Sequence, residues 1–235
     1  MIDNMIDSSG ALDSARQLLA KLNISSAKDV WKPTAYAVRF IAAILRHKAH
    51  FKDAQALDLG CGSGILALAM ADLGAQVTAI DFLESAVAAT QANARRHGFS
   101  ISAMRSDGLT VLKTGALDGT FDALICNPYH LPGEVQSTPN GSDGRRLLDS
   151  AIIDGSLLLR HGGLLLTTCT AGQGFEQTDV LLQRHWNTYR FTIVCEPMSP
   201  YDYPESYRVD CVARGVAHYR NDEIYHSVRF IEAWR

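Results

Sequence analysis

A glycine-rich turn is the strongest chemical feature of the sequence. The stretch 57–64 reads LDLGCGSG and offers four candidates for lining a ligand site: Gly60, Cys61, Gly62 and Gly64. Because glycine has no side chain to clash, the backbone here can turn tightly and approach a ligand closely. Glycine turns also occur in α/β proteins without such a site, so the glycines alone do not define a ligand.

Acidic side chains accompany the turn. Asp58 stands just before it, where a carboxylate could pair with a cationic group, and Asp81 ends the next apolar run, VTAID. A carboxylate at the end of that strand can accept both hydroxyls of a ribose. Phe82 is suited to pack on an adenine face, and Asp107, followed by Gly108, to accept from an adenine amino group. Together these residues predict a site for a nucleoside-type cofactor.

A nicotinamide dinucleotide is the main alternative ligand for this site. Its fingerprint is G-x-G-x-x-G, in which a helix N-terminus meets a pyrophosphate. This chain has G-x-G-x-G instead, with the carboxylate of Asp58 directly before the turn. A sulfonium ligand carries positive charge and no phosphate, so it suits an acidic approach better.

A second candidate site follows the apolar run 121–126 and reads Asn127, Pro128, Tyr129, His130. In a parallel α/β sheet the carboxyl ends of the strands form the ligand crevice. A delocalised nitrogen is a poor nucleophile, but the Asn127 side-chain oxygen and the Pro128 carbonyl could accept its N–H groups and orient it. Tyr129 or His130 would then stack on a planar acceptor. An ordinary Asn-Pro turn is the alternative interpretation.

The loop 198–207 offers a third group of candidates. It carries Tyr201 and Tyr203 with Asp202 and Glu205. Aromatic rings next to carboxylates suit a cationic or amine-bearing small molecule. The alternative is a solvated loop that packs on the edge of the sheet.

The elements that position these residues alternate between strands and helices. Such alternation predicts a parallel sheet with helices on both faces. The tail, 190–196 and 207–217, predicts two strands with no helix between them, and therefore an antiparallel hairpin at the sheet edge. The other expected strands are 55–59, 76–80, 101–105, 121–126 and 164–169, and the expected helices are 11–22, 34–45, 65–73, 83–97, 145–159 and 175–186.

Composition narrows the functional classes. The 235 residues carry a net charge of −3, which gives nucleic-acid binding no electrostatic support. Five scattered cysteines without a C-x-x-C pair indicate reduced thiols. The histidines lack metal-ligand spacing, so no metal is expected. The start of the chain lacks the pattern of a signal peptide, and no apolar run reaches membrane-span length, so we expect a cytoplasmic protein.

These motifs resemble the class I S-adenosylmethionine-dependent methyltransferases over about residues 30–217. The resemblance implies S-adenosylmethionine as cofactor and S-adenosylhomocysteine as product. It also implies a Rossmann-like α/β fold with a seven-stranded, mostly parallel sheet in the order 3-2-1-4-5-7-6. A short helical extension, 1–32, would precede the methyltransferase domain, 33–235. The implied cofactor-binding residues are Asp58, Gly60, Cys61, Gly62, Gly64, Asp81, Phe82, Asp107, Gly108 and Asn127.

The N-P-Y-H motif is similar to the N-P-P-Y signature of amino-group methyltransferases, especially the HemK-type glutamine methyltransferases. The stretches 31–34 (WKPT) and 140–145 (NGSDGR) agree with that family. The resemblance implies Asn127, Pro128 and Tyr129 as catalytic residues. The expected substrate-binding residues are Trp31, His130, Tyr201 and Tyr203.

Two departures from that family affect the expected substrate. The motif lacks the second proline, and only about thirty residues precede the core, where the bacterial release-factor enzymes carry a helical domain. Both favour an amine, amide or guanidine nitrogen of a small molecule. A glutamine on a protein loop, a nucleobase amino group and a non-catalytic cofactor-binding subunit are the alternatives. Assembly of several copies of the chain stays open.

Overall fold

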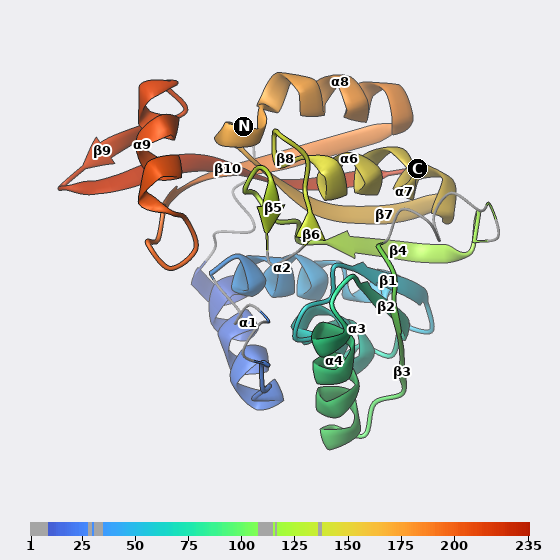
Figure 1. Ribbon diagram of the computed structural model, residues 1–235. Helices are drawn as coiled ribbons and strands as arrows, with labels where there is room; N and C mark the ends of the chain where they lie inside the picture. Colours follow the sequence, from blue (N-terminus) through green and yellow to red (C-terminus); the bar gives the residue numbers. More distant parts are fainter. Residues whose placement is uncertain (1–8, 28–29, 31–34, 108–114, 116, 136–137) are drawn as a thin grey trace.

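A mixed sheet forms the centre of the protein, shown by a computed structural model (Figure 1) that describes all residues except 1–8, 28–29, 31–34, 108–114, 116 and 136–137. Eight strands of this described part pair in the order β3-β2-β1-β4-β7-β10-β8, with β9 added beside β10. The pairs from β3 to β7 are parallel, and β10 is antiparallel to both its neighbours. These strands are β1 Gln55–Leu59, β2 Gln76–Asp81, β3 Ile101–Arg105, β4 Phe121–Cys126, β7 Leu159–Thr170, β8 Thr188–Pro197, β9 Ala217–Arg220 and β10 Glu223–Trp234.

The predicted strand order 3-2-1-4-5-7-6 is confirmed. In this order β7, β8 and β10 are the fifth, sixth and seventh strands along the chain, with β9 and the separate pair β5 and β6 left out of the count. The last strand inserts between the fifth and the sixth, with its register running from Val228 against Thr170 to Trp234 against Leu164. The carboxyl ends of the parallel strands therefore open on one edge of the sheet.

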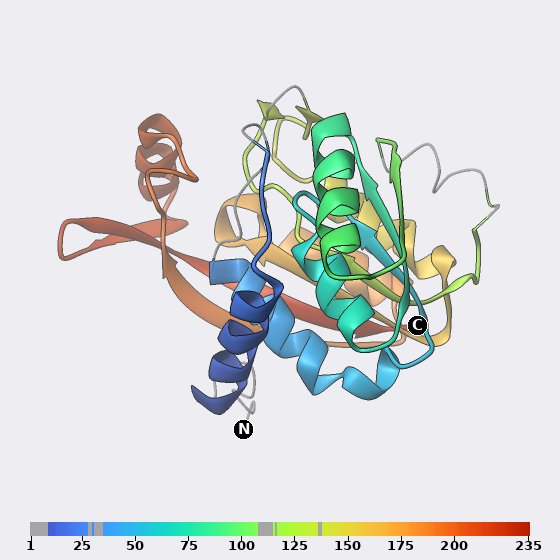
Figure 2. The same ribbon diagram turned by 90° about the horizontal axis from the view of Figure 1, so that it is seen from below.

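Helices cover both faces of the sheet (Figure 1). On one face, side chains of α1, α2 and α3 share a core with alternate residues of the strands; on the other, α6, α7 and α8 do so. Figure 2 shows α3 and α4 lying beside each other on the first of these faces. The helices are α1 Ser9–Leu22, α2 Ala35–Arg46, α3 Ile65–Asp72, α4 Glu84–Arg96, α6 Arg146–Ile153, α7 Gly155–Leu158, α8 Phe175–His185 and α9 Glu205–Ala213, with short 3-10 turns η2 Lys48–His50 and η3 Ala171–Gln173.

Local sequence explains the first strand, turn and helix. The residues of β1 from Ala56 to Leu59 are buried, as a strand covered on both faces requires. Helix α3 is apolar all round, and its residues 65–70 are all buried, which is typical of a helix inside a core. The predicted helix 65–73 and strand 55–59 therefore match the observed elements.

The tail corrects one sequence expectation. Residues 207–217 were expected to form the last strand, but 205–213 form α9, and the last strand is β10. The signals of a helix were present: Glu205 lies in its first turn, and Gly215 follows its end with φ of +72°. The apolar residues of 207–217 fit the two-residue period of a strand as readily as the 3.6-residue period of a helix, so their spacing alone could not distinguish the two. The antiparallel edge strands exist, but α9 and β9 separate them along the chain.

Two smaller differences concern the middle of the chain. The helix expected over 145–159 breaks at Asp154 into α6 and α7, and strand β7 begins at Leu159 and not at 164. Beyond β4, a short antiparallel hairpin that the sequence did not predict pairs β5 Glu134–Val135 with β6 Thr138–Pro139.

The N-terminal helix α1, expected over 11–22, packs on the core through one apolar face. Ala15, Leu18 and Leu22 are buried in the same cluster as side chains of α2 and α3. The proposed boundary at 32 and 33 lies outside the described residues, so the division of the chain stays a prediction. No helix in the described ranges is long and apolar enough to cross a membrane.

Candidate functional site

The turn between β1 and α3 has a backbone that glycine adopts readily. Gly60, Gly62 and Gly64 have φ values of +80°, +53° and +83°, in the left-handed region that other residues rarely enter. A β-carbon on Gly64 would also lie 2.8 Å from the hydroxyl oxygen of Thr90. The chain can therefore turn directly from the strand end into the helix and leave its backbone exposed to a ligand.

Asp81, at the end of β2, accepts a hydrogen bond from the backbone of the turn and lines a cavity beside it. Its Oδ2 accepts a hydrogen bond from the Gly62 N–H at 2.8 Å, and its Oδ1 accepts one from the Leu83 N–H at 2.9 Å. Each carboxylate oxygen has a further lone pair, so both can still accept a ligand hydroxyl. Burial raises the pKa of this carboxyl, and the backbone N–H bonds oppose that rise.

Asp58 lies behind the turn and not on the cavity wall, where the sequence interpretation placed it. The residue is 1% exposed, and its Oδ2 accepts a hydrogen bond from the Ala67 N–H at 3.0 Å. Burial raises its pKa to about 7, and the charge of Asp81 adds to that rise. Its observed contact therefore supports the start of α3.

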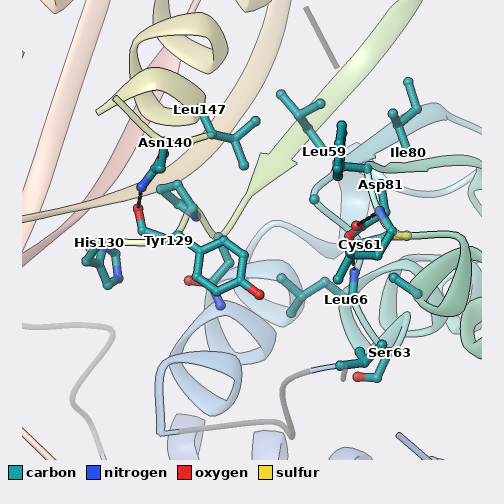
Figure 3. A pocket seen from close by; sticks show the side chains of 18 of the residues that line it. Leu59, Cys61, Ser63, Leu66, Ile80, Asp81, Tyr129, His130, Asn140 and Leu147 are labelled. Atoms are coloured by element: carbon teal, nitrogen blue, oxygen red, sulfur yellow. Dashed lines mark hydrogen bonds between the residues drawn. The ribbon is translucent and has the colours of Figure 1, made fainter. Parts of the chain in front are cut away.

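A cavity of about 420 Å³ joins the glycine turn to the loop after β4 (Figure 3). Its wall near the turn is named the cofactor half, and the wall formed by the loop after β4 and its neighbours is named the acceptor half. The predicted site residues that line the cavity, in one half or the other, are Gly60, Cys61, Gly62, Asp81, Phe82, Asp107, Asn127, Pro128, Tyr129, His130 and Tyr203. Gly64 shapes the turn without lining the cavity, and Trp31 and Gly108 lie outside the described residues.

The N-P-Y-H loop is held from behind by two amide side chains. The Nδ2 of Asn140 donates to the carbonyls of Tyr129 and Leu131, at 3.1 and 2.8 Å. The Nε2 of Gln173 donates to the Tyr129 carbonyl at 3.3 Å. Sequence reasoning missed both roles, because Gln173 follows β7 and reaches this loop only through the fold. The dashed contact of Asn140 is visible in Figure 3.

The two aromatic candidates of this loop have different surroundings. His130 is 8% exposed, its Nδ1 lies 3.1 Å from Gln173 Oε1, and its ring stands edge-on to Tyr36 with centroids 5.4 Å apart. Burial lowers its pKa to about 4, so the ring is neutral near pH 7. Tyr129 is partly exposed on the cavity wall (Figure 3). Of the two rings, that of Tyr129 is the more accessible to a planar acceptor.

The loop before α9 brings Tyr203 and Asp202 to the acceptor half. Tyr203 is 4% exposed, and its hydroxyl lies 3.3 Å from that of Tyr36, which also lies 3.1 Å from Nε2 of His226. Asp202 lines the cavity, and desolvation raises its pKa. Tyr201, by contrast, is 93% exposed and does not line the cavity, so the structure does not bring it to the site as expected.

Several lining residues went unnoticed in the sequence. Tyr36 belongs to an amphipathic helix, where an aromatic residue at helical spacing indicates core packing more often than a site. Arg146 and Leu147 open α6, beyond the stretch 140–145 that the resemblance had marked. Only the folded structure shows that the start of α6 approaches the glycine turn. A β-carbon on Gly60 would lie 3.2 Å from Leu147 Cδ2.

The cofactor half fits S-adenosylmethionine. The glycine backbone gives access, the carboxylate of Asp81 can accept ribose hydroxyls, and Asp107, the residue expected to accept from an adenine amino group, also lines the cavity. Phe82 and Leu83 add apolar wall for a base. Dinucleotide sites also place an acid at the end of the second strand, so the G-x-G-x-G spacing of the turn, in place of G-x-G-x-x-G, is what favours S-adenosylmethionine here.

Comparisons with known proteins show which family the chain resembles. The family model described as the methyltransferase small domain matches residues 31–193. The chain is 33% identical over 139 residues to a release factor glutamine methyltransferase of Gloeobacter violaceus, covering 52% of this chain and 47% of that protein. It is 39% identical over 126 residues to the enzyme of the same name from Chlorobaculum tepidum, covering 46% and 43%. The chain thus spans about half the length of these relatives.

A solved structure shows the same fold. A 16S rRNA N2 methyltransferase of T. thermophilus, in complex with S-adenosylmethionine and guanosine, superposes with a TM-score of 0.57. The match covers 90% of this chain and 45% of that one, at 17% identity. Since the family model matches well over half of the residues, the chain belongs to the methyltransferase small domain family, whose methyl donor is S-adenosylmethionine.

Proposed function

We propose that this protein transfers a methyl group from S-adenosylmethionine to a nitrogen of a small molecule. The observation that carries the proposal is the position of Asn127 and Pro128 on the wall of the same cavity as the glycine turn and Asp81. A turn without function would have no reason to face the cofactor half. S-adenosylmethionine, when bound, supplies an electrophilic methyl group on a sulfonium.

The protein's own residues then have to orient a weak nucleophile and exclude water. The Asn127 side-chain oxygen and the Pro128 carbonyl are the acceptors available to the N–H groups of the substrate. Asn140 and Gln173 fix the following carbonyls of the loop, so the acceptors are held in place before the substrate arrives. Tyr129 offers a ring face for a planar acceptor.

A small substrate is supported by the cover over the acceptor half. Asp202 and Tyr203 close on this half from the segment between β8 and α9, and Tyr36 closes on it from α2. Tyr203 belongs to a small core of its own with Met198, Cys211 and Ile224, so this part of the wall is packed. A packed wall around a cavity of about 420 Å³ favours a small acceptor over a protein loop.

A glutamine side chain of a protein is the second candidate substrate. The relatives from Gloeobacter violaceus and Chlorobaculum tepidum both carry the name release factor glutamine methyltransferase, which favours an amide nitrogen on a protein. Small-molecule and protein acceptors present similar N–H groups to Asn127, so the two candidates differ in what surrounds the nitrogen.

The deciding experiment follows a radioactive methyl group from S-adenosylmethionine to its acceptor. The purified protein is incubated with methyl-tritiated S-adenosylmethionine and a cell extract, which is then separated into small molecules, protein and nucleic acid. We expect alkali-stable label in the small-molecule fraction, absent with Asn127→Ala. Asn127-dependent label in protein would replace the small-molecule substrate by a protein glutamine, and label in nucleic acid would overturn both.

A further inference from the structure

The side-chain amide of Gln173 has only one orientation that its surroundings accept. Its Nε2 donates to the carbonyls of Gly144 and Tyr129, at 2.6 and 3.3 Å, and its Oε1 accepts from the Thr170 N–H at 3.1 Å. Turned by half a rotation, the amide would set its oxygen against two carbonyl oxygens and its nitrogen against an N–H group. Three backbone groups therefore fix which atom is the oxygen.

This orientation determines the protonation of the neighbouring imidazole. The Oε1 of Gln173 lies 3.1 Å from Nδ1 of His130, and an amide oxygen can only accept, so Nδ1 carries the hydrogen. In a neutral ring the other nitrogen, Nε2, then carries the lone pair. The ring is neutral over the ordinary pH range because burial lowers its pKa to about 4.

The lone pair on Nε2 is available to a ligand. Among the residues that the structure describes, Nε2 has no hydrogen-bond partner, yet it is not one of the buried polar atoms sealed without one. His130 lines the acceptor half of the cavity. The titratable groups around the ring do not compete for Nε2: Tyr36 from α2 pairs with Tyr203 and with His226 of β10, and the Tyr207 hydroxyl of α9 donates to the His130 carbonyl.

We propose that Nε2 of His130 accepts a hydrogen bond from the acceptor nitrogen and takes its proton during methyl transfer, with Gln173 fixing the required tautomer. The proposal rests on the N-methyltransferase function proposed above. The nitrogen forms its bond to the methyl carbon while the sulfur–methyl bond breaks, leaving the electron pair on sulfur. The nitrogen, now positively charged, gives its proton to Nε2, and the resulting imidazolium returns it to solvent.

The chemistry of this base selects the substrate. A weakly basic imidazole takes a proton readily from a methylated amide or aromatic amine cation, because such cations are strong acids. An alkylammonium ion is a much weaker acid and would keep its proton. Asp202 also lines this half of the cavity, and its carboxyl group suits a polar or cationic part of the substrate. We therefore infer an acceptor that carries at least one N–H on a delocalised nitrogen.

The tautomer can be determined without any substrate. In the full chain with ¹⁵N-labelled histidine and bound S-adenosylhomocysteine, imidazole ¹⁵N–¹H correlations should show His130 protonated at Nδ1 and bare at Nε2. Gln173→Met, which removes the acceptor for Nδ1, should lose this preference. A His130 ring protonated at Nε2 in the wild type would overturn the proposal. Acetamide, added as the smallest amide probe, should shift the His130 Nε2 resonance saturably, and no shift would also overturn it.

Turnover measurements on a His130 variant provide a second test of the proposal. His130→Phe keeps a planar ring and leaves Gln173 Oε1 with its Thr170 N–H. With the acceptor identified by the label experiment, we expect kcat to fall about 10²-fold or more, the range for a lost general base, with unchanged affinity for S-adenosylhomocysteine. The control His218→Phe, at an exposed position of β9, should retain wild-type turnover. Undiminished turnover in His130→Phe would overturn the base while leaving N-methylation standing, whereas a wild type that labels no nitrogen would overturn the proposed function itself.

Discussion

The two halves of the cavity are assembled from very different lengths of chain. The cofactor half comes mostly from two strand-turn-helix segments, near 59–66 and 80–86. The acceptor half draws on segments far apart in the sequence: Tyr36, 127–131, Asn140, 146–147 and 202–203. The cofactor half is therefore mostly a local structure, as suits a methyl donor shared by the whole family. The acceptor half is a tertiary assembly, as suits a substrate particular to this protein.

The two halves also differ in the ionisation that burial favours. The carboxyls under the turn, Asp58 and Asp81, have raised pKa values, so burial favours their protonated form. The imidazoles around the acceptor half, His130 and His226, have pKa values lowered to about 4 and about 3, so burial favours their neutral form. Desolvation is the first cause in each case, and it acts with opposite sign on an acid and on a base.

Asn127→Ala should separate the halves most strongly. It removes one acceptor for the substrate N–H and leaves the turn intact. We expect turnover to fall by about 10²–10³, as for the loss of one preorganised hydrogen-bonding group at a reacting centre, while the affinity for S-adenosylhomocysteine barely moves. Steady-state kinetics and calorimetry measure the two quantities. Asn127→Asp keeps an acceptor and should retain part of the rate; wild-type rates in both variants would reduce the motif to a turn.

Asp81→Ala should act on the other half. We expect S-adenosylhomocysteine to bind about 1–3 kcal/mol more weakly, the range for hydrogen bonds to a charged group. Calorimetry on the folded variant is the measurement. Since Asp81 also accepts from Gly62 and Leu83, circular dichroism must first show that the turn still folds. Unchanged affinity in a folded variant would remove Asp81 from the cofactor site.

Acidification should destabilise the acceptor half. An imidazole with a lowered pKa in the folded state stays neutral while the unfolded chain takes up a proton, so stability falls as pH drops from about 6.5 towards the folded pKa of about 4. At pH 5 this amounts to about 2 kcal/mol for His130. Urea unfolding of wild type and His130→Phe at pH 7 and pH 5 should therefore show a smaller loss in the variant.

Asp58 should oppose that loss, which makes it a useful control. With a folded pKa of about 7, its carboxyl binds a proton in the folded state before it does in the unfolded chain, so acidification from pH 7 to pH 5 stabilises the fold through this group. Asp58→Asn keeps an acceptor for the Ala67 N–H but cannot titrate, so its loss of stability on acidification should exceed that of the wild type. Equal pH dependence in all three proteins would contradict the contrast between the halves.

The smallest expected effect concerns recognition by Asp202. Asp202→Asn removes the charge that faces the acceptor half, and because the carboxylate is partly screened by solvent, we expect KM for a cationic or polar acceptor to rise by only about two- to fivefold. The matched control is Glu205→Gln, an exposed carboxylate in the first turn of α9. If both variants change KM equally, the effect comes from the electrostatic field of the charges in this segment and not from a contact between Asp202 and the substrate.

The division between the halves is also the division between what the sequence predicted and what it did not. Local signals predicted β1, the turn and α3, because the glycines and the flanking apolar runs all lie within one short stretch. The strand order followed from the resemblance and is confirmed. The prediction for 207–217 was wrong, because its apolar spacing suits a strand or a helix, and packing against Met198 and Ile224 decides between them.

The sequence by itself determined the fold class and the glycine turn, because each strand, turn and helix depends on residues close together in the chain. Only the tertiary structure decided the acceptor half. It left Tyr201 in solvent and brought the hydroxyls of Tyr36 and Tyr203 within 3.3 Å of each other on the cavity wall. At the glycine turn, too, only the structure showed that Asp58 lies behind the turn. It also set Gln173 against His130, which no spacing in the sequence could indicate, since the two residues come from loops after different strands. Contacts of this kind arise when the carboxyl ends of separate strands meet at one edge of the sheet.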